Sequence, residues 1–183
     1  MTVAIVGFGR FGRALGGLLD EAGLAWRAWD SRTEVPEPHR AASAPDALQG
    51  ATHVVVAVPV SAMRPVLEDL RPHLTPAQLV LDVGSVKVRP VQALHDVLGP
   101  RIPWVGTHPL FGPLSLAMAE RPRQVVLCPN PLHPDAAPRA RAFFERLGCE
   151  LLEQSPEGHD RVMAHTHALT FFVAKGMVDA GSG

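Results

Sequence analysis

The sequence predicts an α/β protein with a doubly wound, mostly parallel sheet and a C-terminal helix. Short β-branched runs alternate with amphipathic stretches of helix length, which is typical of βαβ units. Four of the runs are apolar almost throughout, as expected for strands that helices cover on both faces. A glycine-rich turn follows the first run directly. In a sheet of this kind, ligands bind at the carboxyl ends of the strands.

The same pattern predicts where the elements lie along the chain. Strands are expected at 3–6, 25–29, 53–58, 79–82, 104–106, 124–128 and 150–152. Helices are expected at 10–22, 61–73, 88–98, 135–147 and 157–179. The Pro-rich stretch 31–45 is interpreted as a loop or a degraded crossover.

A domain boundary is expected just before Ser155-Pro156-Glu157. Serine is a good N-cap, proline suits the first helical turn, and glutamate favours the positive end of the helix dipole. This divides the chain into a dinucleotide-binding unit, 1–154, and a C-terminal helix, 155–183. The middle of that helix is apolar nearly all round, so we expect it to be buried on more than one side. Either a second copy covers it, making a homodimer, or the sequence is a truncated version of a longer chain.

Composition narrows the class of partner. The chain has 183 residues, 46% of them apolar, with 17 basic and 18 acidic side chains and a net charge of −1. This balance argues against nucleic acid or an anionic membrane and favours a small-molecule partner. With neither a signal-peptide pattern nor an apolar run of membrane-spanning length, a cytoplasmic protein is expected. Cys128 and Cys149 lie in apolar runs and are expected to be reduced and buried.

The glycine-rich turn at 7–12 matches the dinucleotide fingerprint G-x-G-x-x-G in a Rossmann context. It follows the first strand and opens a helix, whose N-terminal N–H groups would face a pyrophosphate. Gly7 permits the tight turn, Gly9 lets the backbone approach the phosphates, and Gly12 allows close packing. The cofactor-binding residues expected here are Gly7, Phe8, Gly9, Arg10, Phe11 and Gly12.

The second strand ends at Asp30, followed by Ser31 and Arg32. A carboxylate here can accept hydrogen bonds from the adenosine ribose, which favours NAD because it would repel a 2′-phosphate. Arg32 could pair with such a phosphate, so NADP stays possible. Alternatively, Asp30 only caps the turn. Val58 and Pro59, where the third strand closes, are expected beside the bound ribose or nicotinamide.

Two further strand ends carry reactive side chains. Ser85 and Lys87 follow the fourth strand, either as ligand contacts or as the start of a helix. His108 ends the fifth strand after Thr107, and Pro109 limits the backbone that aims its ring. A neutral imidazole is a usable proton acceptor at physiological pH, so His108 is the candidate catalytic base, with Ser85 beside it.

The three C-terminal histidines do not form a predicted metal site. On a helix, His165 and His167 point about 200° apart, and His159 is more than a turn away. No metal is therefore expected.

Three segments together resemble the prephenate/arogenate dehydrogenase family of tyrosine biosynthesis. They are Gly-Phe-Gly-Arg-Phe-Gly at 7–12, Asp-Val-Gly-Ser-Val-Lys at 82–87 and Thr-His-Pro-Leu-Phe-Gly-Pro at 107–113. Gly-His-Asp at 158–160, with the helix that follows, resembles the family's passage into its helical dimerisation domain. The resemblance implies an NAD(P)-dependent oxidative decarboxylation of prephenate or arogenate.

The resemblance also implies roles for residues. His108 would take the proton of the substrate hydroxyl as hydride leaves, and Ser85 would orient that hydroxyl or the histidine. Lys87, Thr107 and His167 are weaker candidates for substrate contacts. Family members continue into a longer helical domain that supplies an arginine for a substrate carboxylate, and the family's histidine on its first helix aligns with Phe171. Nearby candidates to replace the arginine are Arg121, Arg123 and Arg161.

Two other functions remain open from the residues. The chain could be an NAD(H)-binding or redox-sensing module that lacks a substrate domain. It could also be a related oxidoreductase acting on a hydroxy acid or an imine, because a serine and a histidine suit that chemistry as well.

Overall fold

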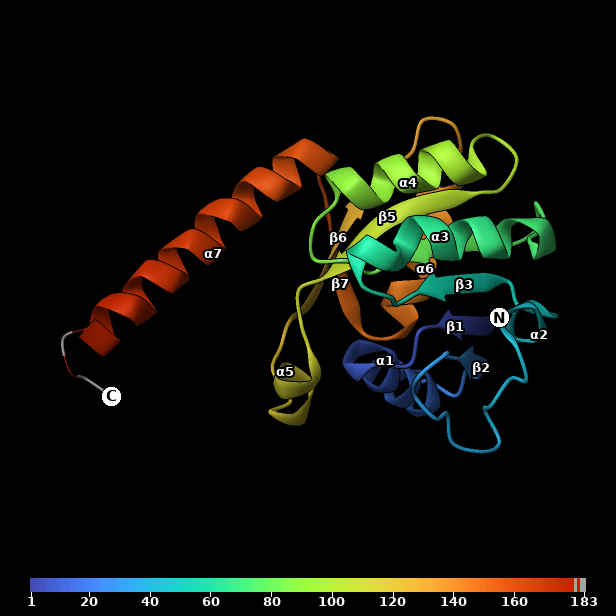
Figure 1. Ribbon diagram of the computed structural model, residues 1–183, viewed down its shortest axis with the longest axis horizontal. Helices are drawn as coiled ribbons and strands as arrows, with labels where there is room; N and C mark the ends of the chain where they lie inside the picture. Colours follow the sequence, from blue (N-terminus) through green and yellow to red (C-terminus); the bar gives the residue numbers. More distant parts are fainter. Residues whose placement is uncertain (180, 182–183) are drawn as a thin grey trace.

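A computed structural model of the chain describes residues 1–179 and 181, without the side chains of 167, 168 and 171. Seven strands form one sheet in the order β2-β1-β3-β4-β5-β6-β7 (Figure 1). The strands are β1 (Thr2–Val6), β2 (Ala25–Trp29), β3 (His53–Val56), β4 (Leu79–Asp82), β5 (Trp104–Pro109), β6 (Arg123–Cys128) and β7 (Cys149–Glu153). The doubly wound, mostly parallel sheet predicted from the sequence is confirmed.

The helices agree with the predicted ranges to within a residue or two. They are α1 (Arg10–Glu21), α3 (Val60–Leu70) with the 3₁₀ turn η1 (Arg71–His73), α4 (Val88–Leu98), α6 (Ala136–Arg146) and α7 (Pro156–Asp179). Two short helices, α2 (Ala44–Leu48) and α5 (Pro113–Ala117), were not predicted. Each is a little over one turn long, so neither shows a helical period in the sequence.

The apolar strands are buried on both faces, as predicted. One core cluster joins Ile5, Leu81 and Val105 to residues of α1 and α6, and the other joins Val6 and Val80 to α2, α3 and α4. The alternate side chains of each central strand thus enter different cores. This double covering leaves the carboxyl ends of β1 to β4 as the natural place for a ligand.

The last two strands reverse direction. β6 pairs with β5 antiparallel and with β7 in parallel. The antiparallel pairing extends β5 to Pro109, where the sequence predicted an end at 106, and pairs His108 with Val126. Since β4 pairs with β5 only up to Gly106, His108 lies beyond the end of β4.

Helix α7 begins as predicted and then leaves the body of the protein (Figure 1). The Gly158 N–H donates to the Ser155 hydroxyl oxygen at 3.0 Å, so Ser155 is the expected N-cap. Within this single chain the helix is not buried on several sides, so the expectation that a second copy or a longer chain covers it stays a prediction. Leu169, Phe172 and Val178 are each about 70% exposed, because only the first part of α7 packs on the body, next to α4.

None of the helices in residues 1–179 combines the length and the apolar composition that crossing a bilayer needs.

Candidate functional site

The turn between β1 and α1 requires two of its glycines for steric reasons. Gly7 has φ of +99°, and a Cβ there would lie 2.5 Å from the Ala57 carbonyl oxygen. A Cβ on Gly12 would lie 2.2 Å from the Gly7 carbonyl oxygen. Any side chain at either position would therefore displace backbone. The tight turn at Gly7 and the close packing at Gly12 are both as the sequence predicted.

The middle glycine of the turn faces open space. A Cβ on Gly9 would have no heavy atom within 4 Å, and Gly9 is the N-cap of α1 without a side-chain hydrogen bond. The first N–H groups of a helix have no acceptor within the helix, and the positive end of its dipole lies there. The geometry is that of an anion-binding helix N-terminus.

Asp30 organises the adjoining loop. Its carboxylate accepts hydrogen bonds from the N–H groups of Phe8 at 2.6 Å, Arg32 at 2.7 Å and Thr33 at 2.8 Å. Burial by itself would raise the pKa of the Asp30 carboxyl, but the backbone hydrogen bonds outweigh it and hold the pKa below its usual value. The turn-capping alternative is thus realised, although two carboxylate oxygens can accept about four hydrogen bonds in all.

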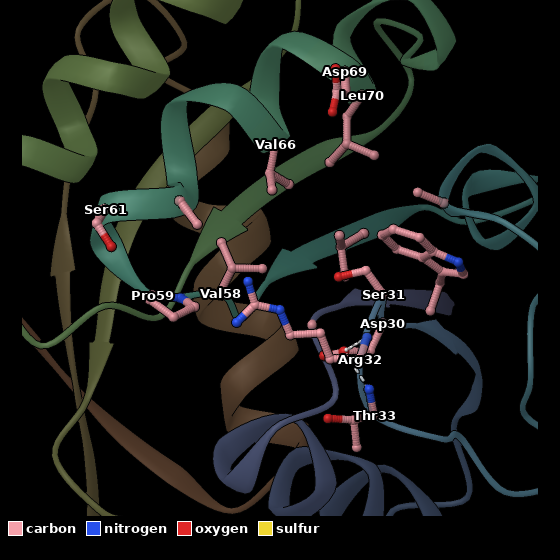
Figure 2. Close-up of a pocket in the computed structure, with 15 residues that line it drawn as sticks. Asp30, Ser31, Arg32, Thr33, Val58, Pro59, Ser61, Val66, Asp69 and Leu70 are labelled. Atoms are coloured by element: carbon pink, nitrogen blue, oxygen red, sulfur yellow. Dashed lines mark hydrogen bonds between the residues drawn. The ribbon is translucent and has the colours of Figure 1, made fainter.

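A cavity of about 550 Å³ opens where the chain connections diverge from β1, beside the glycine turn (Figure 2). Six of the predicted site residues line it: Gly7, Asp30, Ser31, Arg32, Val58 and Pro59. Arg32 extends across it towards Val58 and Pro59 (Figure 2). Connections that diverge at one sheet edge are the usual place for a nucleotide in such folds.

The opposite wall was not predicted as part of the site. It comes from α3, which contributes Ser61, Ala62, Val66, Asp69 and Leu70. Met63, Leu67 and the body of Leu70 pack into the core. The available signal was the amphipathic period of the helix: the residues between its buried positions had to face either solvent or a ligand.

The side chains of three residues of the glycine turn lie outside the lining of this cavity. The Phe8 ring is buried and stacks on Trp26 with 5.8 Å between the ring centroids, while its N–H is bonded to Asp30. Phe11 packs against Phe111. Arg10 lines a different hollow, between α1 and α5. The backbone at Gly9 and the start of α1 is therefore what this motif presents at the site, whereas the Phe8 and Phe11 rings pack against other aromatic side chains.

The segment after β4 is held by a buried ion pair. Lys87 and Asp82 are both fully buried, and the Lys87 ammonium donates to the Asp82 carboxylate and to the Thr107 carbonyl. The other Asp82 oxygen accepts the Thr107 N–H at 3.1 Å. These bonds join the end of β4 to the residue before His108.

This arrangement corrects two expected substrate contacts. Neither Lys87 nor Thr107 has a surface that a bound substrate could touch, since each is 0% exposed and its polar atoms are bonded within the protein. We propose a supporting role for them instead. Ser85 is exposed in the segment between β4 and α4 and is not the helix cap, because α4 has its N-cap at Lys87.

His108 lies partly buried on β5, and its ring contacts α7. Its Nδ1 is 2.8 Å from Nε2 of His159, and the two rings meet edge to face with their centroids 5.0 Å apart. His159 is fully buried, and its Nδ1 is 2.7 Å from Oδ1 of Asp160. Asp160 in turn accepts the N–H groups of Lys87 and Val88. A chain of hydrogen bonds thus runs from β5 through α7 to the start of α4.

The sequence reasoning missed His159 and Asp160 as site residues. It considered His159 as a metal ligand together with His165 and His167, and as part of the Gly-His-Asp segment at 158–160, without a role in the site. Of the other two, His165 contacts the Arg161 carbonyl of its own helix, and the side chain of His167 lies outside the described residues, as does that of Phe171. Among the described side chains, no group of three histidines, cysteines or acids could hold a metal ion. The signal for His159 was its place beside an acid in the first turn of a predicted helix.

The candidate arginines for a substrate carboxylate take different places. Arg123 is buried on β6 and donates to the Leu147 carbonyl. Arg121 and Arg161 are exposed.

Comparison with known proteins identifies the family. A family model described as the nucleotide-binding domain of prephenate dehydrogenase matches residues 38–152, more than half of the chain. The chain belongs to the prephenate dehydrogenase family. The matched segment contains the α3 wall of the cavity, the Lys87 ion pair and His108, whereas the glycine turn and Asp30 precede it.

Curated relatives of the family are longer than this chain. It is 29% identical over 121 residues to a probable arogenate/prephenate dehydrogenase of Methanocaldococcus jannaschii, a match that covers 65% of the chain and 27% of that protein. It is 32% identical over 145 residues to the cyclohexadienyl dehydrogenase of Zymomonas mobilis, covering 75% and 49% respectively. The chain therefore spans less than half of each of these relatives.

Solved structures of the family superpose on nearly the whole chain. The arogenate dehydrogenase of Synechocystis matches with a TM-score of 0.82 and 26% identity, covering 100% of this chain and 70% of that one. The prephenate dehydrogenase of Aquifex aeolicus matches with a TM-score of 0.78 and 25% identity, covering 97% and 71%. Family membership thus extends through α7 in structure, beyond the segment matched by the family model.

Proposed function

We propose that this chain carries the cofactor-binding half and the catalytic base of a dehydrogenase that oxidatively decarboxylates prephenate or arogenate. The observation that carries the proposal is the position of the His108 ring: it contacts His159 and lies at the same carboxyl edge of the sheet as the glycine turn. The relatives named arogenate/prephenate and cyclohexadienyl dehydrogenase support the substrate class. They also support the expectation that further residues, outside this chain, complete the substrate pocket.

The residues present fit a dinucleotide. The open backbone at Gly9 suits a pyrophosphate, and the 550 Å³ cavity between Asp30 and α3 suits an adenosine. When bound, the nicotinamide would supply the acceptor for the substrate hydride. A prephenate dehydrogenase of Aquifex aeolicus was solved with NAD+, at 22% identity to this chain.

We propose NAD as the preferred cofactor. The Asp30 carboxylate, with a pKa below its usual value, is ionised at neutral pH and would repel a 2′-phosphate. Arg32 lines the cavity and extends across it, so its positive charge would lessen that repulsion. Arg32→Ala should therefore weaken NADP binding more than NAD binding in calorimetry. Arg89→Ala, at an exposed position on α4, is the matched control. Tighter binding of NADP than NAD by the unchanged protein would overturn the preference.

His108 would act as the general base. Its imidazole would take the proton of the ring hydroxyl as hydride leaves the same carbon, and the exposed Ser85 hydroxyl would help to orient that hydroxyl. General-base assistance of this kind typically contributes about 10²–10⁴-fold to the rate. Withdrawing the proton makes hydride loss easier because the electron pair of the oxygen forms the carbonyl-type bond as the hydride departs.

The test is NAD reduction followed by absorbance in the presence of prephenate and, separately, arogenate. His108→Asn should lower kcat by about 10²–10⁴-fold while NAD affinity in calorimetry stays unchanged. His73→Asn, at an exposed position in η1, is the matched control. Equal rates for His108→Asn and the unchanged protein would refute the role of His108.

A second candidate is a module that binds NAD(H) without turnover. It is favoured by the placement of Arg123, which is buried and bonded to a main-chain carbonyl instead of being free to bind a carboxylate. This candidate predicts tight NAD(H) binding and no reduction of NAD with either substrate. The same assays therefore separate it from the dehydrogenase.

We further propose that a second copy of the chain covers α7, giving a homodimer. The support is the set of exposed apolar side chains along the helix, among them Leu169, Phe172 and Val178. Light scattering coupled to size-exclusion chromatography measures the mass directly. A monomer at micromolar concentration would overturn this proposal.

A further inference from the structure

His159 is a fully buried polar side chain whose two ring nitrogens both have partners. Its exposed fraction is 0%, its Nε2 lies 2.8 Å from His108 Nδ1, and its Nδ1 lies 2.7 Å from Asp160 Oδ1. The three side chains come from β5 and α7 and form one linear series. The proposed base is therefore joined to the Asp160 carboxylate through a second imidazole, which is itself buried.

The hydrogen-bond partners of Asp160 decide which way the protons point. The carboxylate accepts the Lys87 N–H at 2.6 Å and the Val88 N–H at 3.0 Å. Burial alone would raise its pKa, but the hydrogen bonds from Val88, His159 and Lys87 outweigh burial and hold the pKa below its usual value. An ionised carboxylate only accepts hydrogen bonds, so the proton in its bond with His159 lies on His159 Nδ1.

The same reasoning continues to His108. In a neutral imidazole one nitrogen donates and the other accepts, so a His159 ring protonated at Nδ1 accepts at Nε2. Its partner, His108 Nδ1, must then donate. The proton of neutral His108 is thereby kept on Nδ1, so Nε2 is the ring nitrogen that carries no proton.

We propose that His159 and Asp160 are positioning residues that hold His108 in the Nδ1–H tautomer, with Nε2 as the basic nitrogen. This inference rests on the proposed function at one point only, namely that the substrate hydroxyl is the group that gives its proton to His108. In the step concerned, the substrate O–H bond breaks and its proton bonds to His108 Nε2, the oxygen electron pair forms a C=O bond, and the C–H bond of the same carbon breaks to release hydride. The oxidised nicotinamide, when bound, would be the hydride acceptor. His108 becomes an imidazolium, whose Nδ1–H still donates to His159.

Neighbouring charges support this arrangement. The imidazolium formed on His108 is connected through His159 to the Asp160 carboxylate, which stabilises a positive charge at this place. Lys87, whose ammonium donates to the carbonyl of the residue before His108, is paired with the Asp82 carboxylate. A third group that orients the base is a recurring feature of sites that use histidine as a proton acceptor.

Long-range ¹H–¹⁵N correlation spectra of the imidazole rings test the proposal without turnover, because the two tautomers give different nitrogen shifts. At about pH 8, above the ordinary histidine pKa, we expect the Nδ1–H tautomer for both rings. His108→Asn and His159→Gln assign the signals, since each removes one ring. The Nε2–H tautomer of His108 in the unchanged protein would overturn the proposal.

Two substitutions of His159 separate positioning from simple packing. In His159→Gln the amide oxygen can still accept from His108, so the Nδ1–H tautomer of His108 should persist. In His159→Phe the acceptor is lost, and His108 should shift to Nε2–H. His73→Gln is the matched control and should change neither ring. An unchanged His108 tautomer in folded His159→Phe contradicts the proposal.

Turnover gives an independent readout. His159→Phe should lower kcat by about 10²–10⁴-fold, the contribution of general-base catalysis, with little change in KM, and His159→Gln should lose less. If the tautomers are as expected but prephenate and arogenate do not reduce NAD, the proposed function fails and the positioning role stands. If turnover is present and His108 carries its proton on Nε2, only the positioning role fails.

Discussion

Replacing Lys87 by methionine tests the buried ion pair that joins the end of β4 to β5. Both partners are fully buried, and the ammonium donates to the Asp82 carboxylate and to the Thr107 carbonyl. Methionine keeps much of the volume and the apolar stem, but it leaves a buried carboxylate without its cation and a buried carbonyl without this donor. Breaking a buried pair in this way costs about 3–5 kcal/mol of unfolding free energy.

Urea unfolding followed by circular dichroism measures this loss of unfolding free energy, and thermal unfolding measures the change in Tm. In a chain of this size each kcal/mol changes Tm by about 2–4 °C, so Lys87→Met should lower Tm by about 6–20 °C. Adding Asp82→Asn should recover part of the loss, because the uncompensated charge is then removed.

The control for this experiment is Lys175→Met. Lys175 forms an exposed pair with Asp179 on α7, and breaking a pair of that kind changes stability by less than about 1 kcal/mol. If Lys87→Met is no more destabilising than Lys175→Met, the reasoning about the buried pair is refuted.

Three further predictions concern the glycine turn, a buried histidine and the thiols. Gly12→Ala should abolish NAD binding in calorimetry, because its Cβ would lie 2.2 Å from the Gly7 carbonyl oxygen. Gly17→Ala is the control: a Cβ there has open space on the same helix, so NAD affinity should be unchanged and the free energy of unfolding should rise by up to about 1 kcal/mol. Burial lowers the pKa of His53 to about 4. Between pH 6.5 and 4 the unfolded state therefore binds a proton that the folded state excludes, so the free energy of unfolding falls as the pH falls. The urea midpoint of His53→Gln should fall less over this pH range than that of the unchanged protein, because glutamine does not titrate. Burial also raises the pKa of Cys128 to about 12 and of Cys149 to about 11, so a thiol reagent should label them only on unfolding; rapid labelling of the folded protein would contradict this.

Much of the cofactor side of the site could be predicted because its signals are local. The glycine turn, its strand and its helix are contiguous, and Asp30 ends the next strand, so spacing alone brings them to one edge. The role of Asp30 could not be separated from turn capping in the same way. That choice depends on where the N–H groups of Phe8, Arg32 and Thr33 point, which is a property of the folded loop.

Lys87 illustrates the opposite case. Its place after a strand end suggested a ligand contact, because that edge of the sheet binds ligands. The folded chain instead turns the side chain inwards, where Asp82 and Thr107 supply acceptors. A sequence gives the charge of a side chain, but the direction in which it points depends on which acceptors lie within reach.

The sequence by itself determined the alternation of strands and helices, the glycine turn and the strand end that carries His108, because each depends on hydrophobic period or on neighbouring residues. Only the tertiary structure decided the reversal of β6, the burial of Lys87 and the partner of His108. His108 and His159 are 51 positions apart and meet only because α7 starts against the end of β5. A hydrogen bond requires both groups within about 3 Å, and the spacing of two residues in the sequence does not determine that distance when several strands and helices lie between them.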